Sequence, residues 1–313
     1  MNNKTFSSVV LYSYMRPELT NSAIERVLAW DRLKTLYISI DGLRSGASRE
    51  EIKWRNETIN ICKNLEKLNS NIVTIVWEIN SGLTGHTLRM LERVFSEEEY
   101  IIGLEEDQNV SSQGLSFLLE RVSDNDLPKI ATAFSRQIHK GNCLGYRVTW
   151  FPEQWGLAFN KLFYLEFLKV IESSKVDIDI VRGVFYQILG KTRRTKLAIE
   201  KWVNIFNSAL ISQNWTDAIF HYTAIKNSIP YAAPWGSYTE DLGHLDFRSL
   251  NPRTRKVTFK YHRGKVLKSN FGHFCHKCER INSGTNFLFF SPEFRGKIYR
   301  LIQTKLRFYN SSF

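Results

Sequence analysis

Three consecutive carboxylates, Glu105, Glu106 and Asp107, are the residues of this chain that most strongly suggest chemistry. They follow an apolar segment at residues 100–104, which predicts a buried strand that ends on the acids. Three negative charges this close together repel one another unless a cation or a charged ligand lies among them. The cluster therefore predicts a divalent-metal and phosphate site, and the alternative is a solvated acidic turn.

The segments before the cluster alternate between strand and helix patterns. Strands are predicted at residues 7–14, 36–40, 72–79 and 100–105, and helices at residues 18–30, 50–68, 86–95 and 114–122. This alternation is typical of a mostly parallel sheet with helices on both faces. The predicted fold class is therefore α/β and Rossmann-like.

Polar side chains gather at the end of each predicted strand. They are Ser13, Tyr14 and Arg16 at the first, Asp41 at the second, Asn80 at the third and the acids at the fourth. Crossover handedness brings the carboxyl ends of parallel strands to one edge, so we expect a shared ligand site there. Any strand-to-loop transition also collects polar residues, so this pattern favours a nucleotide site without requiring it.

The rest of the chain is predicted to be mostly helical. We expect a strand at residues 129–134, helices at 164–171, 172–205 and 214–226, an extended segment at 229–234 and a polar loop at 235–246.

The composition of the 313 residues points to an anionic partner. A net charge of +12 and a pI near 9.5 suit a nucleotide, an anionic lipid surface or a nucleic acid. The 4 cysteines give no disulfide framework, and from the pattern of apolar residues we expect neither a signal peptide nor a membrane-spanning segment. We expect a cytoplasmic location, with peripheral contact to the inner face of the membrane as an alternative.

A series of short motifs across residues 7–250 resembles the nucleotide-sugar-dependent glycosyltransferases of the GT-A fold. The resemblance extends to bacterial sugar transferases and, more distantly, to N-acetylglucosaminyltransferase I. The motifs lie, in order, at residues 12–17, 38–42, 80–83, 104–107, 154–157, 214–217 and 240–244. The resemblance implies transfer of a sugar from a nucleotide-diphosphate donor, with UDP or GDP as the nucleotide, to a hydroxyl of a glycan or lipid-linked glycan. No nucleic acid is then expected as a partner.

The resemblance also implies how the donor is held. It places Asp41 against the base or ribose, and Ser13, Tyr14, Arg16 and Asn80 along the nucleotide. Glu105 and Glu106 would belong to the donor site as well. Asp107 would bind Mn²⁺ or Mg²⁺, which stabilises the charge that develops on the leaving diphosphate. The Glu-Glu-Asp sequence departs from the Asp-x-Asp pattern of the family, which puts metal dependence in question.

Asp217 occupies the place of the general base in inverting members of this family. It would accept the proton of the attacking hydroxyl, a role that contributes about 10²–10⁴-fold. The alternative is an acid in the first turn of a helix that serves only the helix dipole, with Glu240 and Asp241 as rival bases.

The acceptor side is less defined. Asp241 is assigned there, and Trp155 would stack on a sugar or simply fill the core. His244 would be a second metal ligand or a pyrophosphate contact, with a structural role as the alternative. We expect a nucleotide-sugar half at residues 1–150, an acceptor half of the same domain at 151–260 and a basic extension at 261–313.

Two signals near the carboxyl terminus remain open. The group His273, Cys275, His276 and Cys278 could bind zinc or consist of incidental side chains. A basic amphipathic helix over residues 294–309 could rest on an anionic bilayer or pack on the domain.

Two other functions compete with the glycosyltransferase. A basic nucleic-acid-binding protein would use clustered Lys and Arg, as at residues 191–196 and 256–263. A glycosyltransferase-like scaffold without activity is the other alternative. Dehydrogenases and P-loop hydrolases are disfavoured because their glycine-rich turns are missing.

Overall fold

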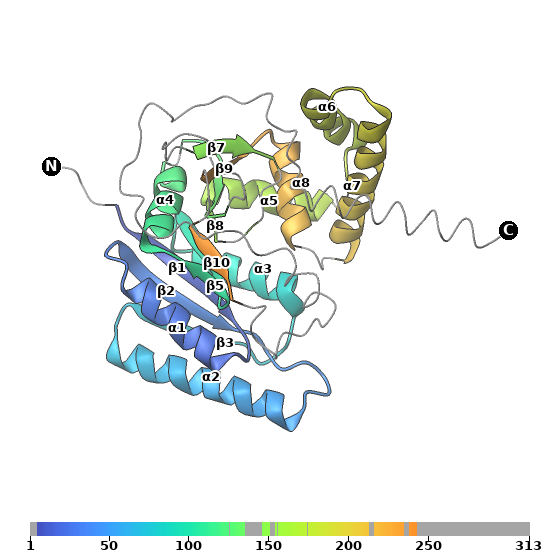
Figure 1. Cartoon of the computed structure of the whole chain (residues 1–313). Helices are drawn as coiled ribbons and strands as arrows, with labels where there is room; N and C mark the ends of the chain where they lie inside the picture. Colours follow the sequence, from blue (N-terminus) through green and yellow to red (C-terminus); the bar gives the residue numbers. More distant parts are fainter. Residues whose placement is uncertain are drawn as a thin grey trace.

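The computed structural model describes residues 5–124, 126–134, 146–150, 154, 156–173, 175–212, 216–234 and 238–242. Within them, eight strands form one mixed sheet that is flanked by helices, which confirms the predicted α/β class (Figure 1). The strands of this sheet are β1 (Ser7–Ser13), β2 (Leu33–Ile40), β3 (Ile72–Val76), β4 (Tyr100–Glu105), β6 (Ile130–Thr132), β7 (Tyr146–Thr149), β8 (Leu157–Asn160) and β9 (Tyr231–Pro234). Two further strands, β5 (Gln108–Val110) and β10 (Thr239–Asp241), pair with each other.

The sheet has the order β3-β2-β1-β4-β8-β6-β9-β7. Its first four strands are parallel, as predicted, so their carboxyl ends share one edge. Strand β8 then runs antiparallel between β4 and β6, and β7 runs antiparallel to β9. Since strands from before and after residue 150 interleave in it, both predicted halves belong to one sheet.

Helices cover both faces of the sheet (Figure 1). The helices are α1 (Pro17–Leu28), α2 (Arg49–Leu68), α3 (Gly82–Phe95), α4 (Ser112–Val122), α5 (Lys161–Ser173), α6 (Ile178–Leu189), α7 (Arg193–Ser212) and α8 (Thr216–Lys226). On one face, Val9, Leu11 and Ile102 pack against α1, α2 and α4. On the other, Val10 and Ile101 pack with α3 and α5–α8. Because successive strand residues alternate between faces, Glu105 at the end of β4 lies on the same face as Ile101 and Gly103.

Local chemistry explains several helix boundaries. Pro17 opens α1 with a fixed φ angle, and Ser48 and Glu51 form a capping box at α2. Ser111 caps α4 by accepting a hydrogen bond from Gly114 N. The helical segment predicted over residues 172–205 consists mainly of two helices, because Asp177 caps α6 and Gly190 ends it before α7 begins.

The polar loop predicted at residues 235–246 is also wrong in part, since it contains β10. Strand β10 pairs antiparallel with β5, with Asp241 opposite Gln108. Leu242 N donates to Asp107 O at 2.8 Å, which extends this contact to the acidic turn. Polar three-residue strands give no apolar alternation, so only the tertiary pairing makes them strands.

Gly42→Ala should destabilise the fold by about 3 kcal/mol. A Cβ at residue 42 would lie 2.2 Å from Ile79 C and 2.3 Å from Asn80 N, so the backbones after β2 and β3 would have to separate. The matched control is Gly183→Ala in α6, where a Cβ meets nothing within 4 Å. There we expect a gain of about 0.5–1 kcal/mol, because alanine loses less backbone entropy in a helix. Urea unfolding of both variants checks the difference, and equal stability would contradict this account of Gly42.

No helix in the described part of the chain is both long and apolar enough to cross a bilayer. Several predicted features lie outside the described residues. They are the candidate zinc ligands His273, Cys275, His276 and Cys278, the tail helix at 294–309, the basic segment at 256–263 and the extension at 261–313.

Candidate active site

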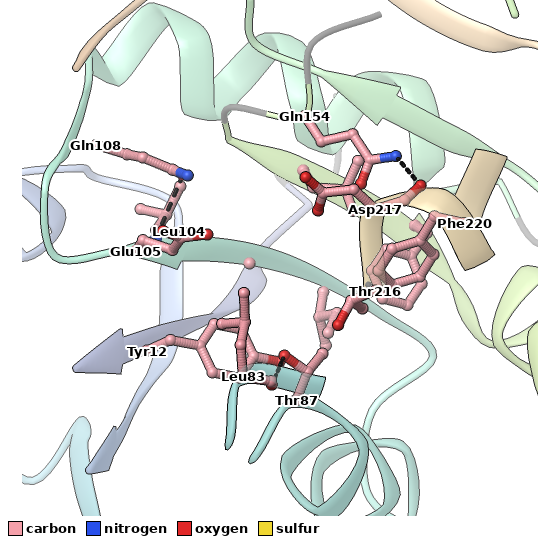
Figure 2. A pocket seen from close by; sticks show the side chains of 14 residues that line it. Tyr12, Leu83, Thr87, Leu104, Glu105, Gln108, Gln154, Thr216, Asp217 and Phe220 are labelled. Carbon is pink, nitrogen blue, oxygen red and sulfur yellow. Dashed lines mark hydrogen bonds between the residues drawn. The ribbon is translucent and has the colours of Figure 1, made fainter. Parts of the chain in front are cut away.

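A pocket lies at the end of β4, between the sheet and helices α3 and α8 (Figure 2). Its walls are mainly apolar and include Leu83, Leu157 and Phe220. Its volume is about 60 Å³. A space of this size suits the reacting part of a substrate rather than a whole nucleotide.

Gly103 opens this pocket. It lies on β4 in the same alternation as Ile101 and Glu105, which also line the pocket. A Cβ at residue 103 would lie 3.6 Å from Tyr12 Cε2 and 3.7 Å from Leu157 O, both ordinary contacts. The position therefore tolerates a small side chain, and the glycine leaves its space to the pocket.

Asp217 enters the pocket from the first turn of α8 (Figure 2). Thr216 Oγ1 donates to Thr84 Oγ1 at 2.8 Å, which ties the start of α8 to the start of α3. Gln154 Nε2 donates to Asp217 O at 2.9 Å and to Tyr231 Oη at 3.0 Å. The backbone at Asp217 is therefore fixed by the contact of its neighbour Thr216 with α3 and by the contact of its own carbonyl with Gln154.

Asp217 has the pKa expected of a base near neutral pH. Asp217 is exposed at the surface, and it also lines the pocket. Desolvation raises the pKa of Asp217 to about 6. The carboxylate is therefore mainly ionised at neutral pH but holds a proton more readily than an ordinary aspartate.

Glu105 lines the same pocket from β4 (Figure 2). Burial raises its pKa well above the ordinary value, and the negative charges of Asp107 and Asp217 raise it further. Glu105 and Asp217 are thus two carboxyl groups with different proton affinities in one pocket. Such a pair is typical of sites that move protons.

The other two acids of the cluster contact Arg16 instead. Arg16 Nε donates to Glu106 Oε1 at 2.7 Å, and Arg16 Nη1 donates to Asp107 Oδ2 at 2.8 Å. Burial alone would lower the pKa of Arg16, but Glu106 and Asp107 hold it above its ordinary value, so the guanidinium stays charged. The cation among these acids is therefore an arginine of the chain itself.

Asp107, one of the two predicted metal ligands, is engaged by Arg16 and does not fit a divalent ion in this arrangement. Asp107 Oδ2 already accepts a hydrogen bond from Arg16, and His244 lies outside the described residues. Across the described ranges, no three His, Cys, Asp or Glu side chains are grouped so that they could hold a metal ion.

Asp41 and Asn80 stabilise the turns beside the site. Asp41 is 6% exposed, and its Oδ1 accepts hydrogen bonds from Gly42 N at 2.9 Å and Ser81 N at 3.4 Å. Asn80 Nδ2 donates to Gly42 O at 2.7 Å. Both residues lie at the shared strand edge, but neither lines the pocket.

The residues after β1 are also placed at this edge. Ser13 Oγ and Thr20 Oγ1 share a buried hydrogen bond of 2.6 Å, and Tyr14 Oη accepts from Arg44 N at 3.2 Å. Neither Ser13 nor Tyr14 lines the pocket. The structure therefore brings Glu105 and Asp217 into the pocket and places the other predicted donor-site residues around it.

On the acceptor side, Asp241 is described only by its backbone, which pairs with Gln108 in the β5–β10 ladder. Trp155 lies outside the described residues. Gln108 is a site residue that the sequence did not indicate. Its Oε1 accepts from Glu105 N at 3.3 Å and Gly156 N at 2.9 Å, so it joins the acidic turn to the start of β8. Its position directly after the acidic cluster was the one available signal.

Comparisons with known proteins leave the family open. No family model and no curated protein matches this chain. A mannosyltransferase from Pyrobaculum calidifontis, in complex with GDP-Man and Mn²⁺, is 9% identical with a TM-score of 0.39, and the match covers 52% of this chain and 47% of that one.

Two other solved structures match at a similar level. A 4-diphosphocytidyl-2C-methyl-D-erythritol synthase from Anaerococcus prevotii is 12% identical with a TM-score of 0.35, covering 53% of this chain and 75% of that one. A cytidylyltransferase from Leptospira borgpetersenii is 12% identical with a TM-score of 0.32, covering 54% and 64%. Similarities this weak carry no inference about activity, which must rest on the residues of this chain.

Proposed function

We propose that this protein is an inverting glycosyltransferase that moves a sugar from a nucleotide-diphosphate donor to a hydroxyl of a glycan or lipid-linked glycan. The observation that carries the proposal is the pairing of Asp217 with Glu105 in one pocket at the carboxyl edge of parallel strands. In open α/β sheets this edge is where ligands bind. The ordered motifs described above support the same activity.

In this proposal Asp217 is the general base. The acceptor oxygen attacks the anomeric carbon, the hydroxyl proton passes to the Asp217 carboxylate, and the bond from the anomeric carbon to the diphosphate oxygen breaks. Its electron pair leaves with the nucleoside diphosphate. Attack opposite the leaving group inverts the configuration of the anomeric carbon. The raised pKa of Asp217 suits this role because a base is most effective when its pKa lies near the working pH.

Glu105 would serve the donor sugar. Its raised pKa favours the protonated carboxyl, which can donate a hydrogen bond to a sugar hydroxyl beside the reacting carbon. The nucleotide would lie along the strand ends that carry Ser13, Tyr14, Asp41 and Asn80, since the pocket is too small to hold it.

The acceptor would approach from the segment predicted for it, residues 151–260. Trp155 would supply a surface on which the acceptor sugar stacks. Asp241 would lie near the acceptor, because its backbone pairs with Gln108 beside the acidic turn. An acceptor linked to lipid would bring the protein to an anionic membrane surface.

The rate of transfer should rise with pH through about 6. Asp217 can accept a proton only when ionised, and its pKa is raised to about 6, so protonation at lower pH removes the base. The measurement is kcat/KM across the range of about pH 5 to 8. A flat profile across this range would show that Asp217 does not act as the base.

Nucleotide binding tests the proposed function. The thermal unfolding midpoint should rise with either UDP or GDP and not with CMP. If no nucleotide changes the midpoint, the protein does not bind a nucleotide donor and the proposal fails. If a nucleotide binds but the protein transfers no sugar from any nucleotide-sugar donor, the protein is instead an inactive scaffold.

A further inference from the structure

The acids at the end of β4 have their counter-charge within the chain. We propose that Arg16 takes the place of a divalent cation at this strand end, so that the nucleotide diphosphate is bound without Mn²⁺ or Mg²⁺. This inference rests on the proposed function, because it concerns how the same site holds its donor.

Arg16 lies between two of the acids and contacts both. Its guanidinium bridges Glu106 and Asp107 with contacts of 2.7 and 2.8 Å, one to each carboxylate. The side chains are 17%, 6% and 16% exposed for Arg16, Glu106 and Asp107, so water screens these pairs only partly. A metal ion entering between the two acids would first have to break both charge-assisted hydrogen bonds.

The guanidinium of Arg16 also reduces the net negative charge at this strand end. Arg16 offsets one of the two charges of Glu106 and Asp107. Glu105 lines the pocket and is not part of this bridge. The guanidinium therefore relieves part of the repulsion between Glu106 and Asp107 that would otherwise attract a divalent ion.

Arg16 has more hydrogen-bond donors than its two acidic partners use. A guanidinium has five N–H donors in a planar fork that matches carboxylate and phosphate oxygens. Glu106 and Asp107 use two of the donors of Arg16, and among the described residues the others have no partner. The two acids fix the orientation of the fork, and the remaining donors can bind a diphosphate oxygen.

Calorimetry of the wild-type protein tests this inference separately from the proposed function. UDP and GDP are titrated once in EDTA and once in excess Mn²⁺. We expect the Kd of the bound nucleotide to differ by less than about twofold between the two conditions. Binding that occurs only with Mn²⁺ would overturn the role of Arg16 and leave the proposed function intact. Absence of binding in both conditions would refute the proposed function and this inference with it.

Arg16→Gln provides a readout that does not depend on activity. The substitution leaves Glu106 and Asp107 without a cation, so this variant should bind Mn²⁺ alone at least about tenfold more tightly than wild type. Free Mn²⁺ is measured by electron paramagnetic resonance. The double variant Arg16→Gln/Asp107→Asn should lose the gained affinity. Unchanged Mn²⁺ affinity in Arg16→Gln would overturn the inference.

Arg44→Gln is the matched control. Arg44 Nη2 pairs with Glu51 Oε1 at 2.6 Å, but its side chain is 53% exposed and its partner is a single acid at the start of α2. We expect no gain in Mn²⁺ affinity there. If Arg16→Gln fails to fold, the wild-type titration with Mn²⁺ alone still decides, since tight binding would overturn the inference and absence of binding supports it.

Discussion

Asp217→Asn should lower the rate of sugar transfer by about 10²–10⁴-fold, the usual contribution of a general base. The amide keeps the shape of the side chain but cannot accept the hydroxyl proton. Nucleotide affinity should stay within about twofold of wild type, because Asp217 lies in the pocket and not along the strand ends. Steady-state kinetics and nucleotide titration measure the two effects separately.

Asp179→Asn is the control that separates catalysis from a helix-dipole role. Asp179 is also an acid in a first turn, that of α6, and it pairs with Arg182 on the surface. If Asp217 served only the dipole of α8, both substitutions would cost stability of about 0.3–1 kcal/mol and leave turnover unchanged. Retained turnover in Asp217→Asn would therefore rule out the base.

Gly103→Val should abolish most of the activity by filling the pocket, with a loss of about 100-fold in kcat/KM. The valine methyl groups would occupy space between β4 and α8 that the acceptor hydroxyl and anomeric carbon need. Valine suits a strand, and a Cβ at residue 103 meets only ordinary contacts at 3.6 and 3.7 Å, so we expect the fold to persist.

Gly103→Ala gives the graded comparison. One methyl group should lower kcat/KM much less than valine does, and the thermal unfolding midpoints of both variants should stay close to that of wild type. Full activity in folded Gly103→Val would show that the reaction takes place elsewhere. Nucleotide titration again serves as the separate measure, because the strand ends are not altered.

The parallel half of the fold could be predicted because its signals are local. Each strand of this half is an apolar run, and each ends on polar residues that share the edge once the crossovers are right-handed. Pairing of β5 with β10 could not be predicted, because three-residue polar strands become strands only through contact with one another. The break between α6 and α7 was missed because both helices carry helical periodicity.

At the site, the residue types were predictable but their partners were not. The sequence shows three adjacent acids that need a cation, and in the structure Glu105 ends β4 while Glu106 and Asp107 form the turn after it. That the cation is Arg16, far away along the chain, depends on β1 and β4 being neighbours, with Glu106 N bonded to Tyr12 O at 3.1 Å. The pocket itself depends on the absence of a side chain at Gly103, which has no periodic signal.

The most direct test is release of nucleoside diphosphate from a panel of UDP- and GDP-linked sugars, with water or a glycan hydroxyl as acceptor. The wild-type protein should release UDP or GDP from one donor, and NMR of the product should show inversion at the anomeric carbon. Asp217→Asn should release little or none. If the wild-type protein binds a nucleotide but releases none from any donor, or if Asp217→Asn turns over as fast as wild type, the proposed chemistry of this pocket is wrong.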